Sequence, residues 1–211
     1  PRTRRGAAAH LSARSPQRLA IDGPAGRLEV AASDPGAARR GVALIAHPHP
    51  LYGGTLDNKV VQTLAKAFVA LGYCALRLNF RGVGASDGVF DEGRGEVEDF
   101  LALAEYARRS YGEAGLVLAG FSFGAFVAAT AAGQLAPRHL VLAGPAVNRF
   151  AVGTVPAGTL VVHGEEDDVV PLKDVFDWAR PQQLPVVVFP GAGHFFHGSL
   201  VTLQRLVERH C

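Results

Sequence analysis

Short apolar runs alternate with segments of helical pattern along most of this chain. The apolar runs, each of strand length, lie at residues 41–47, 73–80, 116–121, 139–143, 159–164 and 185–189. Helical patterns lie at residues 96–110, 123–133, 172–179 and 195–210, and a further helix is expected from a cap at Thr55 or Asp57 to about Leu71. Near-continuous apolar strands that alternate with helices indicate an α/β fold, with a mostly parallel sheet covered by helices on both faces.

Two earlier segments are expected to form an edge hairpin. Residues 18–22 and 27–32 flank Gly-Pro-Ala-Gly at residues 23–26, which is a turn signal between two strand-like segments. The expected sheet is therefore doubly wound and has about eight strands. In such sheets ligands bind beyond the carboxyl ends of the strands, so the residues that follow the apolar runs are the candidates for a functional site.

The segment Gly120–Gly124, which reads Gly-Phe-Ser-Phe-Gly, joins an apolar run to a run of small residues. A serine in a G-x-S-x-G turn between strand and helix has a strained backbone, and its hydroxyl is lifted clear of the sheet. Glycine is needed on either side because a Cβ there would collide with the neighbouring strand or helix. The same pattern also occurs in turns whose serine is incidental. A base and an acid near Ser122 would distinguish the two cases.

A serine hydroxyl needs a base to become a nucleophile, and the base needs an orienting group. Four consecutive acids, residues 165–168, follow the run at residues 159–164, and His194 follows the run at residues 185–189. The chain order serine, acid, histidine is the one expected when the nucleophile turn comes first in a doubly wound sheet. These groups therefore fit a single site, whereas His194 taken alone would fit a capping or packing role.

From about residue 18 to its end, the chain with these motifs resembles the small α/β-hydrolases. In that superfamily the segment after the seventh strand often reads G-x-x-D-x-x-V-P, and residues 164–171 match it with Asp167 at the acid position. The resemblance selects Asp167, with Asp168 as runner-up, and the Gly-Ala-Gly-His segment that ends at His194 matches the family's histidine loop. It implies Ser122 as nucleophile, His194 as general base and then acid, and Asp167 as the group that orients the imidazole.

An acyl-transfer site also needs hydrogen-bond donors for the oxyanion. The backbone N–H of Phe123 is expected to be one donor, and the loop after the strand at residues 41–46 is expected to supply the other. That loop reads His-Pro-His-Pro, and proline has no N–H, so His49 is the first choice and Leu51 the second. His-Pro-His-Pro with the following Tyr-Gly-Gly resembles small bacterial α/β-hydrolases near the dienelactone-hydrolase-like and short-chain esterase groups.

The chain has only a loop where relatives with a cap domain carry an insertion after the sixth strand. No cap domain is therefore expected, and the site should be open and shallow. Leu51, Tyr52 and Phe195 are expected to contact the substrate, and Phe90 and Phe196 are further candidates for apolar walls. Packing within the core or the loop is the alternative for the aromatic residues.

Length and composition favour one domain. The 211 residues are 48% hydrophobic, and no apolar stretch approaches the roughly 18 residues that span a bilayer. The net charge is +2, but the first 18 residues hold five arginines and no acid, so the rest is net negative. We expect a flexible arm at residues 1–17, an α/β-hydrolase domain at residues 18–211, and neither a nucleic-acid nor a membrane partner.

Cys74 lies in an apolar run and Cys211 is the last residue, which indicates a reducing cytoplasm rather than a disulfide framework. No cofactor and no metal is expected, since the chain offers no thiolate cluster and the hydrolase fold accounts better for His47, His49 and His163. A homodimer is compatible with the sequence.

The expected activity is hydrolysis of small carboxylic esters through an acyl-enzyme. The alternatives are a thioesterase, a small peptide or amide hydrolase, and a catalytically silent α/β-hydrolase scaffold that binds a ligand or a partner.

Overall fold

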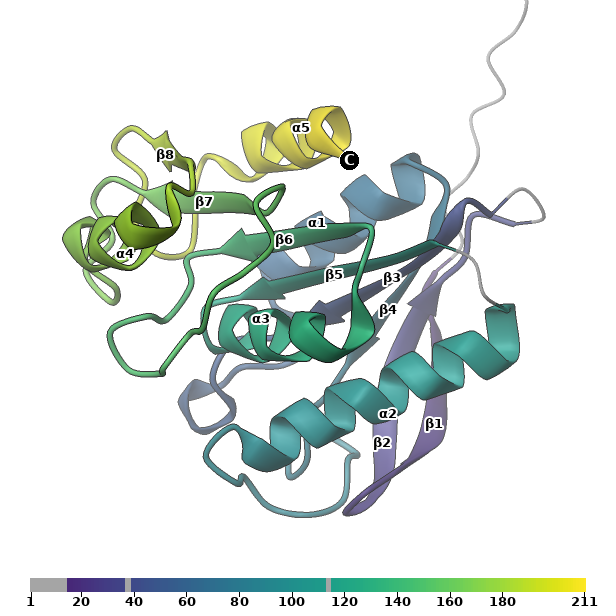
Figure 1. Ribbon diagram of the computed structural model, residues 1–211. Coiled ribbons are helices and arrows are strands. Elements are labelled where there is room, and N and C mark those ends of the chain that lie inside the picture. Colours follow the sequence, from purple (N-terminus) through teal and green to yellow (C-terminus); the bar gives the residue numbers. More distant parts are fainter. Residues whose placement is uncertain (1–14, 37–38, 113–114) are drawn as a thin grey trace, which may run out of the picture.

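Eight strands form one sheet in the computed structural model, which describes residues 15–36, 39–112 and 115–211 (Figure 1). The strands are β1 (Gln17–Gly23), β2 (Gly26–Ser33), β3 (Gly41–Ala46), β4 (Tyr73–Leu78), β5 (Gly115–Phe121), β6 (His139–Ala143), β7 (Leu160–Gly164) and β8 (Val186–Phe189). Their order across the sheet is β1-β2-β4-β3-β5-β6-β7-β8. The hairpin β1–β2 is antiparallel and β2 runs antiparallel to β4, whereas β4 to β8 are parallel. The expected mostly parallel sheet of about eight strands is confirmed.

Helices cover both faces of this sheet. They are α1 (Lys59–Ala70), α2 (Arg94–Tyr111), α3 (Phe123–Leu135), α4 (Leu172–Ala179) and α5 (Leu200–His210), with 3-10 turns at Pro50–Tyr52 and Arg180–Gln182. Helices α1 and α5 pack on one face, while α2, α3 and α4 lie on the other (Figure 1). All residues of β3 are buried, and they alternate between the two cores, which explains the continuous apolar runs.

The direction of winding reverses beside β3, which lies between β4 and β5. From β3 the chain passes through α1 to β4 on one side, and then crosses through α2 to β5 on the other side. Ligands bind beyond the carboxyl ends of the strands at such a point. The loop that begins at His47 follows β3 and Ser122 follows β5, so the topology places both at this position.

The last helix begins at Leu200 and not at Phe195, which corrects the expected boundary. Phe196 (φ 52°) and Gly198 (φ 77°) have left-handed backbone conformations, and these interrupt a helix. The residues after His194 are therefore a loop. As a consequence Phe195 stays beside the site, while Phe196 turns into the core and is completely buried.

The cap of α1 also differs from the expected one. Asn58 is the N-cap, and its Oδ1 accepts the N–H groups of Val60 at 2.9 Å and Val61 at 3.4 Å. Thr55 Oγ1 instead accepts the N–H of Asp57, before the helix begins. Asn58, which directly precedes the first helical residue, therefore caps α1 in place of the expected Thr55 or Asp57.

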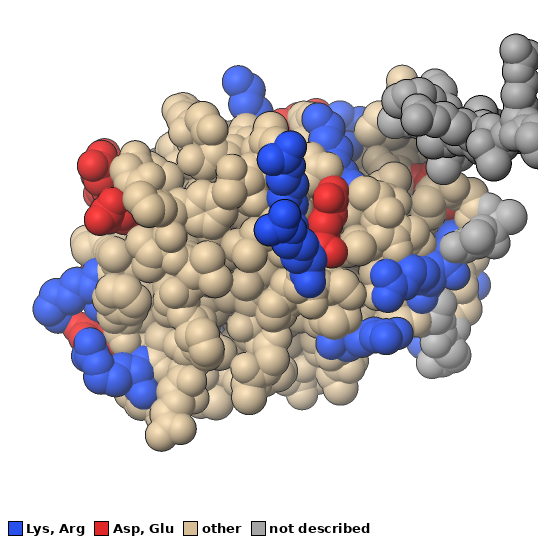
Figure 2. Space-filling view, turned by 90° about the horizontal axis from the view of Figure 1, so that it is seen from above, with Lys and Arg blue, Asp and Glu red and all other residues tan. Residues whose placement is uncertain are grey.

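The surface shows no large patch of one charge on the face seen in Figure 2, where positive and negative side chains are scattered over an uncharged background. No described helix is long and apolar enough to cross a membrane. Of the arm expected at residues 1–17, residues 1–14 lie outside the described part of the chain, and Gln17 already belongs to β1.

Candidate active site

Ser122 sits in a sharp turn between β5 and α3. Its backbone has φ 57° and ψ −117°, a conformation that non-glycine residues rarely adopt. A Cβ on Gly120 would lie 2.1 Å from the carbonyl oxygen of Gly124, and a Cβ on Gly124 would lie 2.3 Å from that of Ala46. The N–H of Ser122 donates to Ala143 O on β6 at 2.9 Å, which ties the strained residue to the sheet. The glycines therefore permit the approach that lifts the hydroxyl out of the sheet.

The structure brings Ser122, His194 and Asp167 into one hydrogen-bonded row. Ser122 Oγ lies 3.0 Å from His194 Nε2, and His194 Nδ1 lies 2.7 Å from Asp167 Oδ2. The carboxylate can only accept, so Nδ1 carries the proton and Nε2 is left to accept the serine hydroxyl proton. All three residues are buried, and Ser122 is the most exposed of them at 8%. The row has the geometry in which an imidazole can withdraw the proton of a serine nucleophile.

Two backbone groups fix the other oxygen of the Asp167 carboxylate. Its Oδ1 accepts the N–H of Val169 at 3.0 Å and that of Val170 at 2.8 Å. Burial raises the pKa of Asp167, whereas the hydrogen bonds from His194 and Val170 lower it. Together with the nearby histidines these bonds outweigh burial, so the pKa of Asp167 lies below its usual value. The carboxylate therefore stays ionised beside the imidazole. The runner-up Asp168 is exposed, and the imidazole bond goes to Asp167.

His163, the penultimate residue of β7, lies under this carboxylate. Its Nε2 donates to Val170 O at 2.8 Å and is 3.3 Å from Asp167 Oδ2, and the ring is completely buried. Burial lowers the pKa of His163, which keeps the ring neutral. The residue therefore supports the acid without adding a charge. No group of three or more His, Cys, Asp or Glu side chains that could hold a metal ion occurs in the described residues.

Two residues that line the cavity, Phe123 and His49, have backbone N–H groups that donate to no described residue. Phe123 is the first residue of α3, so its N–H has no acceptor within the helix. The N–H of His49 donates to no residue that the structure describes, while its carbonyl accepts Tyr52 and Gly54 N–H at 3.1 Å each. The N–H of Leu51 is bound to the Nδ1 of His49 at 3.2 Å. Among the described residues, the N–H groups of Phe123 and His49 are therefore left to donate to a ligand, whereas that of Leu51 is engaged.

His47 fixes the start of the loop that carries His49. Its Nδ1 donates to Pro48 O at 2.6 Å, and its Nε2 accepts Phe80 N–H at 3.1 Å, so both ring nitrogens are used by a neutral imidazole. Burial lowers the pKa of His47 to about 4, a shift that the bond to Pro48 opposes and His49 reinforces. His47 is thus a structural residue of the loop.

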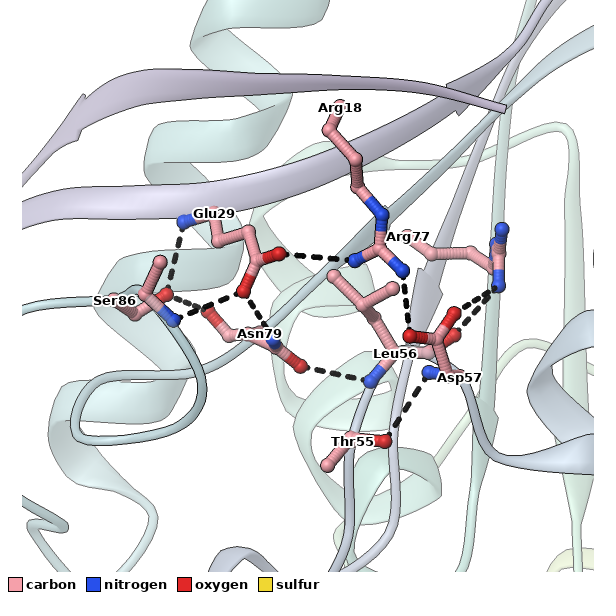
Figure 3. Close-up of polar contacts among 9 residues, drawn as sticks. Arg18, Glu29, Thr55, Leu56, Asp57, Arg77, Asn79 and Ser86 are labelled. Carbon is pink, nitrogen blue, oxygen red and sulfur yellow. Dashed lines mark hydrogen bonds and ion pairs between the residues drawn. The ribbon is translucent and has the colours of Figure 1, made fainter. Parts of the chain in front are cut away.

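Polar side chains in and just after β4 fix the end of the same loop (Figure 3). Asn79, just after β4, accepts Leu56 N–H at 2.8 Å, and Arg77 Nη1 donates to Leu56 O at 2.7 Å. The other end of the Asn79 amide donates to Glu29 at 2.7 Å, and Ser86 Oγ donates to Asn79 O at 2.7 Å. Both backbone groups of Leu56 are thereby paired. The network connects the edge hairpin to the loop beside Ser122.

A cavity of about 340 Å³ opens beside Ser122 and His194. Of the residues expected to contact substrate, Tyr52 and Phe195 line it, whereas Leu51 lies outside its wall and is 68% exposed. Two further wall residues, Arg149 and Phe150, were not predicted from the sequence. They come from the segment after β6, whose local pattern is only that of a loop.

Two other phenylalanines expected near the cavity have different positions. Phe90 does not belong to its wall but packs its ring 4.8 Å from that of His49 and 5.9 Å from that of Phe123. Phe196 packs against Phe121 and Phe189 in the core below the site. Phe90 therefore supports the wall from behind, and Phe196 takes the core role.

No helix occurs in residues 144–159, the segment that would carry a lid, and all of these residues are described. The cavity is accordingly uncovered on that side. This agrees with the expected absence of a cap domain.

Comparisons with known proteins support the same class. A family model described as serine aminopeptidase, S33, matches residues 51–152. A lidless α/β serine hydrolase from Xanthomonas campestris is 38% identical, with 93% of both chains covered and a TM-score of 0.88. An α/β serine hydrolase homologue from Coxiella burnetii is 42% identical, covering 92% of this chain and 96% of that one, with a TM-score of 0.86. An uncharacterised Rickettsia prowazekii protein is 34% identical over 90% of this chain and 91% of its own length.

The chain therefore belongs to the family of small α/β-hydrolases without a lid. Its fold and family define it as a hydrolase.

Proposed function

We propose that the protein is a serine esterase that cleaves small carboxylic esters through an acyl-enzyme. The observation that carries this proposal is the row of Ser122, His194 and Asp167 at an uncovered cavity, with bonds of 3.0 and 2.7 Å. The N–H of Phe123 and that of His49 serve as the oxyanion donors. The roles of these five residues follow from the chemistry of acyl transfer.

In the first step Ser122 Oγ attacks the acyl carbon while its proton passes to His194 Nε2. The carbonyl electrons move to the oxygen, which the two backbone N–H groups stabilise. When the carbonyl re-forms, the bond to the alcohol oxygen breaks and the imidazolium returns the proton to that oxygen. Asp167 stabilises the imidazolium that forms in between and holds its tautomer.

In the second step water takes the place of the alcohol. His194 removes a proton from water as it attacks the acyl carbon, and the same proton then goes to Ser122 Oγ when the acid leaves. The absence of a lid gives water and small esters direct access to the acyl carbon. The cavity volume of about 340 Å³ lies near the lower end of ligand pockets, which favours small acyl groups.

Peptide hydrolysis is the second candidate, because the matching family model is described as serine aminopeptidase. An aminopeptidase must bind a substrate ammonium group, for which a carboxylate is the usual partner. Of the described residues that line the cavity, none is Asp or Glu, and Arg149 is positively charged. The positive charge of the cavity therefore favours an ester substrate over a peptide with a charged amino terminus.

The test compares p-nitrophenyl acetate, acetyl-CoA and alanine p-nitroanilide as substrates for the wild type and Ser122→Ala. We expect the ester to be cleaved fastest and its cleavage to be lost in Ser122→Ala. Cleavage of the anilide alone would contradict the esterase proposal and support peptidase activity instead. A folded wild type that cleaves none of the three would favour a catalytically silent scaffold. The cytoplasmic location and the homodimer stay predictions from the sequence.

A further inference from the structure

The cavity beside Ser122 has one charged side chain in its wall. Arg149 is the one Lys, Arg, Asp or Glu residue among the described residues that line it. Its side chain is exposed, and no ion pair joins it to any described carboxylate. The guanidinium carbon lies 5.8 Å from the centre of the Tyr52 ring. An arginine that no described carboxylate neutralises is thus available to a ligand in the cavity.

The backbone that carries Arg149 is fixed. The N–H of Arg149 donates to Ala146 O at 3.2 Å, and the N–H of Phe150 donates to the same oxygen at 3.1 Å. The neighbouring Asn148 side chain donates to Val169 O at 3.1 Å, which ties this turn to the segment after Asp167. These hydrogen bonds connect the backbone at Arg149 to the segment that follows Asp167.

The remaining wall of the cavity is mainly apolar and aromatic. Phe150 lies with its ring 5.0 Å from that of Phe123, and Phe123 lies next to Ser122 in the chain. His49, whose ring is 5.1 Å from that of Phe123, stays neutral because burial and the Arg149 charge both lower its pKa. The cavity thus combines an apolar wall with one cation, which forms no ion pair with a described residue.

We infer that the substrate of this site is an ester that carries a carboxylate, which Arg149 binds while the apolar part lies against Phe150 and Phe195. This inference rests on the proposed esterase function and narrows its substrate class. The planar guanidinium can donate two parallel hydrogen bonds to a carboxylate, which gives both charge and direction. An uncharged ester of the same length lacks this contact.

Two pairs of esters test the inference and distinguish the side of the ester that bears the charge. The first pair is the mono-p-nitrophenyl ester of adipic acid and p-nitrophenyl hexanoate, which differ by a carboxylate in place of a terminal methyl on the acyl side. The second pair is 4-acetoxybenzoate and 4-methylphenyl acetate, which differ in the same way on the alcohol side. In at least one pair we expect the wild type to have a kcat/KM about two- to fivefold higher for the anion, as an exposed ion pair supplies.

The variants assign the preference to one residue. Arg149→Gln should abolish the preference within the pair, and Arg149→Glu should reverse it. The matched control is Arg209→Gln, which removes an exposed arginine from the end of α5, away from the cavity wall, and should keep the preference. Raising the salt to about 1 M should reduce the wild-type ratio, because the ions screen exposed charges. A wild type without preference in either pair, or a preference unchanged in Arg149→Gln, overturns the inference.

Failure of the esterase proposal is recognised separately. A wild type that hydrolyses none of the four esters contradicts the proposed function. In that case binding of the intact esters to Ser122→Ala, followed by ligand-observed NMR, decides the inference. Tighter binding of the anionic member, lost in the Ser122→Ala/Arg149→Gln double variant, supports it, and equal binding of both members overturns it.

Discussion

Asp167 and His194 meet through a 2.7 Å hydrogen bond between Oδ2 and Nδ1, although 27 residues separate them in the chain. The same carboxylate accepts two backbone N–H groups on its other oxygen. The imidazole is therefore held by a carboxylate that is itself fixed in orientation. This relationship makes the acid of the site testable against its neighbour in the sequence.

Asp167→Asn should reduce kcat for p-nitrophenyl acetate by about 10⁴, because the amide favours the wrong tautomer of His194. Asp168→Asn is the matched control, since this residue is exposed and adjacent, and its kcat should stay close to that of the wild type. Steady-state kinetics on both variants provide the measurement. The opposite result, with Asp168→Asn inactive and Asp167→Asn active, would assign the acid to Asp168.

Gly120→Ala should destabilise the protein by several kcal/mol and remove activity, since its Cβ would lie 2.1 Å from the carbonyl oxygen of Gly124. Gly133→Ala in α3 is the control, because its added Cβ would meet no described atom within 4 Å beyond the neighbouring residues and backbone of its own helix. Replacing an exposed helical glycine by alanine should stabilise the protein by about 0.5–1 kcal/mol. Urea unfolding of both variants measures the difference. Equal stabilities would show that the close approach at the turn is not needed.

His47 should make stability depend on pH. Burial holds the pKa of folded His47 at about 4, while its value in the unfolded chain is near 6.5. Between these pH values the unfolded chain binds the extra proton, so stability is fully present above about pH 6.5 and falls as the pH decreases toward 4. The loss from this residue is on the order of 3 kcal/mol.

Urea unfolding between pH 7 and 4.5 measures that dependence for the wild type and for His47→Gln. The glutamine keeps an acceptor for Phe80 N–H but cannot be protonated in this range. We expect a shallower fall of the unfolding free energy for the variant. Identical slopes would mean that His47 does not contribute to acid sensitivity.

Asn79→Ala should lower stability by about 1–3 kcal/mol, since it leaves the buried N–H of Leu56 without an acceptor. It should also lower kcat, because Leu56 ends the loop that carries His49. Thr55→Ala, which removes only an exposed bond to Asp57 N–H, should have a smaller effect on both. Thermal unfolding and ester kinetics compare the two. An Asn79→Ala protein with unchanged kcat would show that the loop does not depend on this anchor.

The sequence predicts the arrangement of strands and helices well, because burial on both faces of a parallel sheet leaves continuous apolar runs. It also predicts that Ser122, Asp167 and His194 meet, since each follows a strand of that sheet. It leaves open whether Phe196 lines the site or packs in the core, because the left-handed backbone at that residue (φ 52°) decides the direction of its side chain. Short-range pattern alone could not locate this turn.

The position of Arg149 is a second feature beyond prediction from sequence. Nothing in the local pattern separates it from an ordinary exposed arginine. Its position in the cavity wall depends on the turn at Ala146 and on the contact of Asn148 with Val169, a residue from a distant segment. Such tertiary contacts carry no signal in a single sequence.

The most direct measurement of the central claim is mass spectrometry of the folded protein after treatment with a fluorophosphonate probe. A serine activated by the His194–Asp167 pair should react at one equivalent, with the adduct on Ser122. Labelling should fall strongly in Asp167→Asn and persist in Asp168→Asn. A folded wild type that carries no adduct on Ser122, or an Asp167→Asn protein labelled as fast as the wild type, would contradict an activated serine nucleophile at this site.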